Sequence, residues 1–189
     1  MRTFIAIEIS DEMKEALHQI ESHLKYSGAD VKWVKPENIH LTLKFLGEVN
    51  EQKLVEIKAL LDSIAGDIKP FEITIKEIGA FPKIEYPRVI WVRLDKGAGG
   101  SKELAEKIDS ALLKIGFEKE SRPFAAHLTI GRVRSPKNKD KLKEKVASFD
   151  ASQLSAVKPH AISSVVLFHS TLTPQGSIYT KLHEAKLAA

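Results

Sequence analysis

The chain has 189 residues, of which 43% are hydrophobic and 29% charged, so it is long enough and apolar enough to form a globular core. It contains no cysteine, which excludes disulfides, thiolate metal sites and cysteine nucleophiles. The net charge of +4 and the pI of about 9.1 favour a polyanionic partner only weakly. Lys and Glu are abundant while Asn and Gln are scarce, a bias typical of heat-adapted organisms.

The N-terminal residues form the first predicted element. Their apolar stretch is short, contains Glu8 and lacks a small-residue cleavage site, so residues 4–9 are predicted to be a strand rather than part of a signal peptide. No apolar run approaches the roughly 18 residues that a membrane span needs. We therefore expect a cytoplasmic protein without a membrane segment.

The first half of the chain predicts five elements in the order strand, helix, strand, helix, strand. They cover residues 4–9, 11–25, 40–43, 51–64 and 71–81. The first helix is indicated by apolar residues three or four positions apart, and Ser10 is its expected N-cap. These apolar residues are Met13, Leu17, Ile20 and Leu24.

The second half repeats this order at an offset of 87 residues, the spacing between His40 and His127. Its elements cover residues 91–95, 102–115, 127–130, 138–149 and 158–168. Residues 96–100 are predicted to be a flexible loop that leads to a helix starting at Ser101. Because no linker is long enough to separate two domains, we expect residues 1–189 to form a single domain of two lobes related by an approximate twofold axis. The expected fold class is α+β, with duplicated β-α-β-α-β units, two antiparallel sheets facing a central cleft, and helices on the outside.

The two histidine strands carry the residues that suggest chemistry. On a strand, residues two apart share a face, so His40 projects with Thr42 and His127 projects with Thr129. Two imidazoles can act as a general base and a general acid, and two hydroxyls can donate hydrogen bonds to phosphate oxygens. The sequence has no evident set of metal ligands, so we expect neither a metal nor a cofactor. One His-x-Thr strand alone is usually structural, but two at equivalent positions of a repeat favour catalysis over a purely structural duplication.

The remaining candidates leave alternatives open. Arg132 can bind phosphate only if a bulge turns it to the face of His127; otherwise it is structural. Arg88 is either a solvated residue at the start of a strand or an RNA contact. Tyr86 and Phe81 lie in a Pro-containing loop, where each ring either stacks on a base or anchors the loop. Phe45, three residues after Thr42, is predicted to point into the core.

Longer segments around these strands resemble a known family. Residues 40–47 (HLTLKFLG) and 127–133 (HLTIGRV) are similar to the paired H-x-T-x motifs of the 2H phosphoesterase superfamily. Residues 2–7, 33–39 and 87–91 are similar, more narrowly, to the RNA 2',3'-cyclic phosphodiesterases of bacteria and archaea, once named 2'-5' RNA ligases. The resemblance covers nearly the whole chain and shows no departure at the motif positions.

This resemblance implies a specific reaction. The family opens a terminal 2',3'-cyclic phosphate of RNA to a 2'-phosphate, and it has a weak, reversible 2'-5' ligase activity. By analogy, His40 is the proton donor and His127 the proton acceptor, while Thr42 and Thr129 hold the phosphate. The expected partners are RNA ends with cyclic phosphate, tRNA fragments among them, and nucleotides that occupy the cleft. We also expect a monomer.

Two other functions remain open from the sequence. The chain can be a nucleotide-binding module of the same fold that has no turnover, although both His-Thr pairs are intact. It can also be an enzyme of the same superfamily that acts on a small cyclic nucleotide or on a 2'-5' linkage, because the phosphate site would have the same residues.

Overall fold

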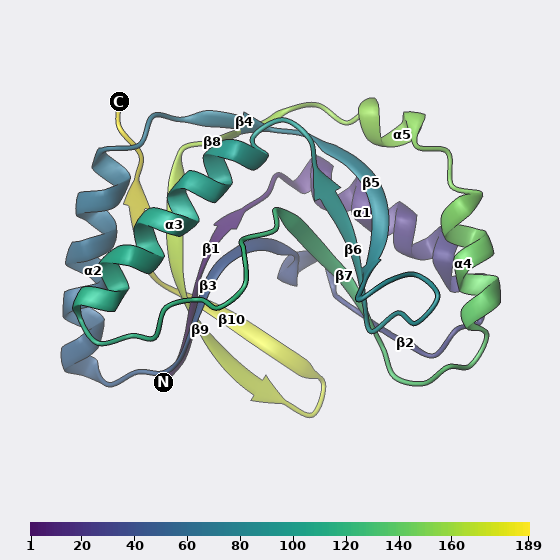
Figure 1. The fold of residues 1–189 in the computed structure, drawn as a ribbon, viewed down its shortest axis with the longest axis horizontal. Coiled ribbons are helices and arrows are strands. Elements are labelled where there is room, and N and C mark those ends of the chain that lie inside the picture. The colour runs from purple at the N-terminus through teal and green to yellow at the C-terminus, as the bar shows by residue number, and fades with distance from the viewer.

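The computed structural model describes residues 1–189 and contains two four-stranded antiparallel sheets. The order of strands in the first sheet is β10 (Gly176–Lys186), β9 (Ser164–Thr173), β1 (Arg2–Glu8) and β3 (His40–Glu48). The order in the second sheet is β2 (Val31–Trp33), β7 (His127–Val133), β6 (Val89–Leu94) and β5 (Ile75–Phe81). A small sheet of β4 (Phe71–Ile73) and β8 (His160–Ile162) lies near the top of Figure 1.

The long helices cover the two large sheets from the outside. They are α1 (Asp11–Lys25), α2 (Glu51–Gly66), α3 (Ala98–Lys114) and α4 (Lys139–Ala147), and shorter helical turns are η1 (Pro36–Asn38) and α5 (Ser152–Ser155). Helices α2 and α3 pack on the first sheet, whereas α1 and α4 lie with the second (Figure 1). We call the first sheet with α2 and α3 the first lobe, and the second sheet with α1 and α4 the second lobe. The expected α+β fold, with antiparallel sheets and outer helices, is confirmed.

The two lobes do not coincide with the two halves of the sequence. The first half gives β1 and β3 to the first lobe, but its helix α1 and its strand β5 belong to the second. The second half makes the reciprocal exchange, because α3 packs on β3 and β9 pairs with β1. Each repeat therefore completes the sheet that the other repeat begins, which the order of elements along the chain did not indicate.

A single cluster of 35 buried residues runs through both lobes. It includes Ile5 and Leu41 from the first sheet and Ile90 and Leu128 from the second. The apolar face predicted for α1 is confirmed, since Met13, Leu17, Ile20 and Leu24 are all fully buried. The Ser10 side chain accepts a hydrogen bond from the Met13 amide at 3.2 Å, as expected of an N-cap.

The start of α3 differs from the prediction. The helix begins at Ala98, after Gly97 with a φ of 81°, so the segment predicted to be a loop forms its first turn. A Cβ on Gly100 would lie 3.1 Å from atoms of the Phe71 ring, so this turn packs closely against β4. Ser101 is fully buried inside the helix and does not begin it. Close packing against β4 explains why a glycine-rich segment is helical here.

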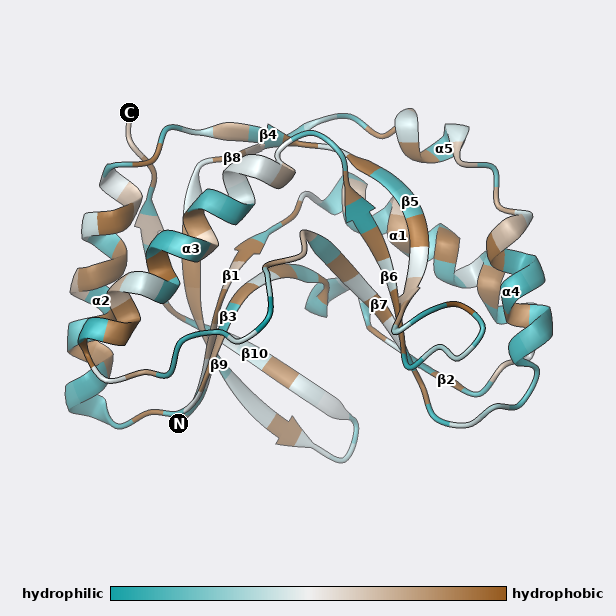
Figure 2. Ribbon diagram, viewed as in Figure 1, coloured by the Kyte–Doolittle hydropathy of each residue, from teal (hydrophilic) through white to brown (hydrophobic).

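Apolar residues follow the inner strands, and hydrophilic residues lie along the outer faces of the helices (Figure 2). The β9–β10 hairpin projects from the middle of the molecule and exposes Leu172 and Ile178 (Figure 1). None of the helices has the length and apolar character needed to cross a membrane.

Candidate active site

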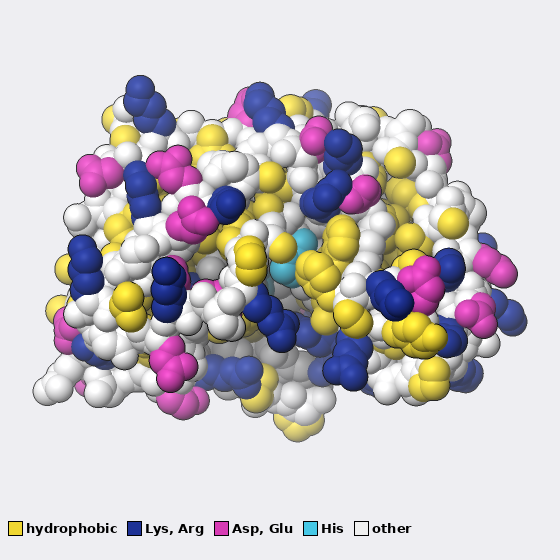
Figure 3. All heavy atoms as spheres, in the orientation of Figure 1, with side chains coloured by type: hydrophobic (Ala, Val, Ile, Leu, Met, Phe, Trp, Pro, Cys, Tyr) yellow, Lys and Arg dark blue, Asp and Glu magenta, His cyan; other side chains and the backbone are white.

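The site is built on two equivalent strands, since β3 begins at His40 and β7 begins at His127. The two strands contact each other where the lobes meet. Leu41 and Leu128 are fully buried, while the histidines and the threonines two residues further on are only half-buried. The alternation predicted for both motifs is thus confirmed, and histidine is visible in the hollow between the lobes in Figure 3.

Aromatic rings surround His40. Phe4 stacks on the imidazole with ring centroids 4.7 Å apart, and Tyr179 approaches it edge-on at 5.2 Å. Burial lowers the pKa of His40 from 6.5 to about 4; the backbone of Asn38 opposes this shift, and the nearby Lys14 adds to it. His40 is therefore neutral at neutral pH.

His127 is held by a backbone carbonyl. Its Nδ1 lies 2.6 Å from the oxygen of Ala125, and a carbonyl can only accept, so Nδ1 carries the hydrogen. The neutral ring thus has its lone pair on Nε2. Burial lowers the pKa of His127, the bond to Ala125 opposes this, and the positive charge of Arg132 lowers it further. Phe81 contacts the ring edge-on at 5.0 Å.

Both histidine strands contain a bulge directly after the threonine. In β3, Thr42 and Lys44 pair with consecutive residues of β1, which leaves Leu43 as the extra residue. In β7, Thr129 and Gly131 pair with consecutive residues of β6, which leaves Ile130 as the extra residue. A bulge shifts the alternation of side chains by one position. The residues that follow therefore point to the opposite face from the one expected of a regular strand.

This shift decides the places of Phe45 and Arg132. The prediction that Phe45 lies in the core is wrong: its side chain is 65% exposed, and its ring lies 6.1 Å from that of Phe4, which stacks on His40. Arg132 is exposed, and its charge acts on His127. The bulge that Arg132 needed in order to face the histidine is present.

The other two candidates lie further from the histidines. Arg88 is exposed just before β6, and its backbone bonds to Phe81 and Val133. Tyr86 is 62% exposed, and its ring contacts Lys139 at 4.8 Å from the ring centroid and Lys83 at 5.4 Å, not a histidine. Neither side chain is brought to His40 or His127 by a contact within the protein.

The aromatic residues around His40 were missed in the sequence. Phe168 and Phe81 are 87 residues apart, and both approach a catalytic candidate, His40 at 6.2 Å and His127 at 5.0 Å. The repeat already aligned these two residues at the ends of the segments 71–81 and 158–168, but it did not indicate that their rings reach the histidines. Tyr179 lies on β10, which comes after the repeated elements, so the repeat contains no signal for it.

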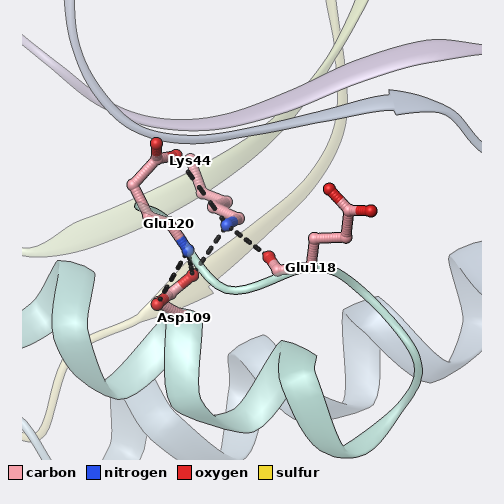
Figure 4. A network of polar contacts seen from close by, with 4 residues as sticks. All are labelled: Lys44, Asp109, Glu118 and Glu120. Atoms are coloured by element: carbon pink, nitrogen blue, oxygen red, sulfur yellow. Dashed lines mark hydrogen bonds and ion pairs between the residues drawn. The ribbon is translucent and has the colours of Figure 1, made fainter. Parts of the chain in front are cut away.

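A buried lysine connects β3 to the segment that leads to His127. The Nζ of Lys44 donates to Oδ1 of Asp109 at 2.7 Å and to the carbonyl of Glu118 at 2.8 Å (Figure 4). Asp109 also accepts from the Glu120 amide at 3.1 Å. The first lobe thereby holds the chain between α3 and β7, whose last residues include the carbonyl that orients His127.

The side chains present do not form an evident metal centre. Nowhere in the chain do three or more His, Asp or Glu side chains gather as ligands of a metal ion would. The polar groups of the site are two imidazoles, two hydroxyls and one guanidinium, a set suited to binding a phosphate and transferring protons.

The family model described as LigT like Phosphoesterase matches residues 7–91 and again residues 94–179. The chain belongs to this family. The two matched segments start 87 residues apart, the offset that separates the two histidines, so the family model matches each unit of the internal repeat separately.

Full-length similarity extends to individual proteins. The RNA 2',3'-cyclic phosphodiesterase of Methanocaldococcus jannaschii is 41% identical over 186 residues, which cover 97% of this chain and 99% of that protein. The crystal structure of TT0787 of Thermus thermophilus matches with a TM-score of 0.80 at 27% identity, over 99% of this chain and 98% of the other. E. coli LigT complexed with 3'-AMP shares the fold, with a TM-score of 0.73 at 23% identity over 100% and 98% of the two chains.

Proposed function

We propose that this protein hydrolyses the terminal 2',3'-cyclic phosphodiester of RNA to a 2'-phosphomonoester by acid-base catalysis between His40 and His127, without a metal or cofactor. The observation that carries the proposal is the placement of both half-buried histidines at the start of two contacting, equivalent strands. Membership of the phosphoesterase family, and a relative named RNA 2',3'-cyclic phosphodiesterase, support this choice of reaction.

His127 is assigned as the proton acceptor and His40 as the proton donor. With Nδ1 of His127 bound to Ala125, its Nε2 is free to take a proton from the attacking water. The water oxygen bonds to phosphorus, the bond from phosphorus to the 3'-oxygen breaks, and His40 gives its proton to that oxygen. The negative phosphate raises the pKa of both histidines on binding, which favours the protonated His40 that the reaction needs.

The remaining polar side chains bind the substrate. The hydroxyls of Thr42 and Thr129 donate to the non-bridging oxygens of the phosphate, and the Arg132 guanidinium balances its charge. Arg88 and Tyr86, both exposed on the second lobe, contact RNA beyond the terminal nucleotide. RNA with cyclic phosphate ends, such as tRNA fragments, is the partner. With a 5'-hydroxyl in place of water as the attacking group, the same side chains give weak 2'-5' ligation, which attack by the 3'-hydroxyl reverses.

We also propose that residues 1–189 act as one domain of two lobes related by an approximate twofold axis, and as a monomer. The exchange of β5 and β9 between the sheets and the continuous core support a single domain. One chain supplies both histidines, so a second copy is not needed for the reaction.

The test uses an oligoribonucleotide ending in a 2',3'-cyclic phosphate, with the product identified as a 2'- or a 3'-phosphate. We expect a 2'-phosphate, turnover that persists in the presence of a chelator, and none with a His40→Ala, His127→Ala double variant. A 3'-phosphate product or full loss of activity with chelator would contradict the mechanism. Tight binding of the RNA without turnover would favour the nucleotide-binding module instead.

A further inference from the structure

A cavity of about 320 Å³ opens beside His40, between the first sheet and helix α1. Its volume suits a ligand of nucleoside size. Tyr179 and Ile178 give it an apolar wall, and the Ile178 side chain is 56% exposed. Lys14 from α1 and Lys35, just before η1, lie at the same cavity.

The two lysines are not neutralised by the acidic residues around them. The cavity also contains Glu8 and Glu37, but Glu8 forms its ion pair with Lys181. Lys14 has only Asp11 at 3.9 Å, and that carboxylate is fully exposed, so their attraction is weak. Lys35 has no acidic partner within 4.0 Å, and Glu37 pairs with neither lysine. Two ammonium groups therefore remain available to an anion.

The direction of the reaction determines which part of the substrate reaches this cavity. In-line displacement puts the attacking water and the departing 3'-oxygen on opposite sides of phosphorus. If His40 protonates the 3'-oxygen, the ribose of the terminal nucleotide lies on the side of His40, where the cavity is. Its base then packs on Tyr179 and Ile178, since an aromatic ring supports stacking with any base.

We propose that Lys14 and Lys35 bind the 5'-phosphate of this terminal nucleotide, the group that joins it to the rest of the RNA. The enzyme thereby prefers an RNA end to a free nucleoside 2',3'-cyclic phosphate, which has the same reactive group without the 5'-phosphate. This inference rests on the proposed function and on His40 as the proton donor. The effect of Lys14 on the His40 pKa agrees with its position near the reacting group.

The test compares adenosine 2',3'-cyclic phosphate with the same compound carrying a 5'-phosphate. For the wild type we expect kcat/KM to be about tenfold higher with the 5'-phosphate, mainly through KM, the size expected from two partly solvated ion pairs. In Lys14→Gln and Lys35→Gln this ratio should fall toward one. Using the ratio removes any effect of Lys14 on the histidine, because both substrates share the reactive group. Lys58→Gln on α2, away from the cavity, is the matched control and should keep the wild-type ratio.

Binding supplies a readout that needs no turnover. Calorimetry with adenosine 2'-phosphate and adenosine 2',5'-bisphosphate should show the same preference in the wild type and its loss in the two lysine variants. Equal kcat/KM for both cyclic substrates, or a ratio that survives in Lys14→Gln and Lys35→Gln, would overturn the inference while leaving the hydrolase intact. If the wild type hydrolyses neither compound nor a cyclic RNA end, the proposed function and this inference both fail.

Discussion

Phe45 and Arg132 occupy equivalent positions of the two histidine strands, 87 residues apart, and each follows a bulge that turns it to the face of its histidine. The ring of Phe45 lies beside Phe4 on the first strand, and the charge of Arg132 acts on His127 on the second. The same backbone device thus presents an apolar group on one side of the site and a cation on the other.

Replacing Arg132 should impair the reaction more than the fold. Arg132→Met should lower kcat/KM by roughly a hundredfold, because the phosphate loses a charged hydrogen-bond donor. Steady-state kinetics with a cyclic RNA end measure the loss. Arg134→Met, also exposed but beyond the end of β7, is the control and should stay close to wild type. An Arg132→Met enzyme with unchanged kcat/KM would show that Arg132 does not bind the phosphate.

The exposed position of Phe45 predicts a small effect on stability. Phe45→Ala should lower the free energy of unfolding by less than about 1 kcal/mol, as expected for a surface residue. Phe4→Ala, at a ring that is 3% exposed, should cost about 3–5 kcal/mol. Urea denaturation of both variants compares them directly. A large loss of unfolding free energy in Phe45→Ala would show that the ring is buried in the core, as expected of a regular strand.

Each histidine should be necessary for turnover. His40→Ala and His127→Ala should each lower kcat by about a hundredfold or more, the usual contribution of a general acid or base. Circular dichroism should show that the variants remain folded, and His160→Ala on β8 should retain activity. If either single variant turns over at the wild-type rate, acid-base catalysis by this pair is wrong.

The lowered pKa values of both histidines predict the pH dependence. The reaction needs one neutral and one protonated imidazole, so kcat/KM should be bell-shaped. Because burial lowers the pKa of His40 to about 4 and also lowers that of His127, the maximum in kcat/KM should lie below pH 6.5. The maximum in kcat should lie at higher pH, since the bound phosphate raises both pKa values. A kcat/KM that still increases above about pH 7 would exclude this electrostatic account.

The buried lysine of Figure 4 should contribute to stability through its partners. Lys44→Met leaves the Asp109 carboxylate and the Glu118 carbonyl without their donor, and should cost about 3–5 kcal/mol of unfolding free energy. Adding Asp109→Leu should recover part of that cost, because the uncompensated charge is gone. Thermal and urea unfolding of the single and double variants give the values. A double variant less stable than Lys44→Met would show that the carboxylate does not need this lysine.

Local patterns in the sequence predicted much of the fold and the centre of the site. The spacing of apolar residues identified α1, and its buried face agrees. The alternation along a strand placed His40 with Thr42 and His127 with Thr129, because two residues apart on a strand always share a face. The offset of 87 residues indicated that these strands are equivalent, and the family model matches the chain twice at that offset.

Other features depended on contacts between distant segments. The pairing of β5 with β6 and of β9 with β1 exchanges strands between the halves, since hydrogen bonds between strands are set by the whole sheet and not by either strand alone. The start of α3 depends on the close approach of Gly100 to Phe71, which no pattern within residues 96–101 contains.

What the sequence determined by itself is the identity and spacing of the reactive groups, because strand alternation is a property of consecutive residues. What only the tertiary structure decided is which further residues join them. The extra residue directly after the threonine of each histidine strand reverses the faces of the next residues, so Phe45 and Arg132 came to the site through the register with β1 and β6. The cavity beside His40 likewise exists because β9 and β10, the last strands of the chain, lie in the same sheet as β1 and β3.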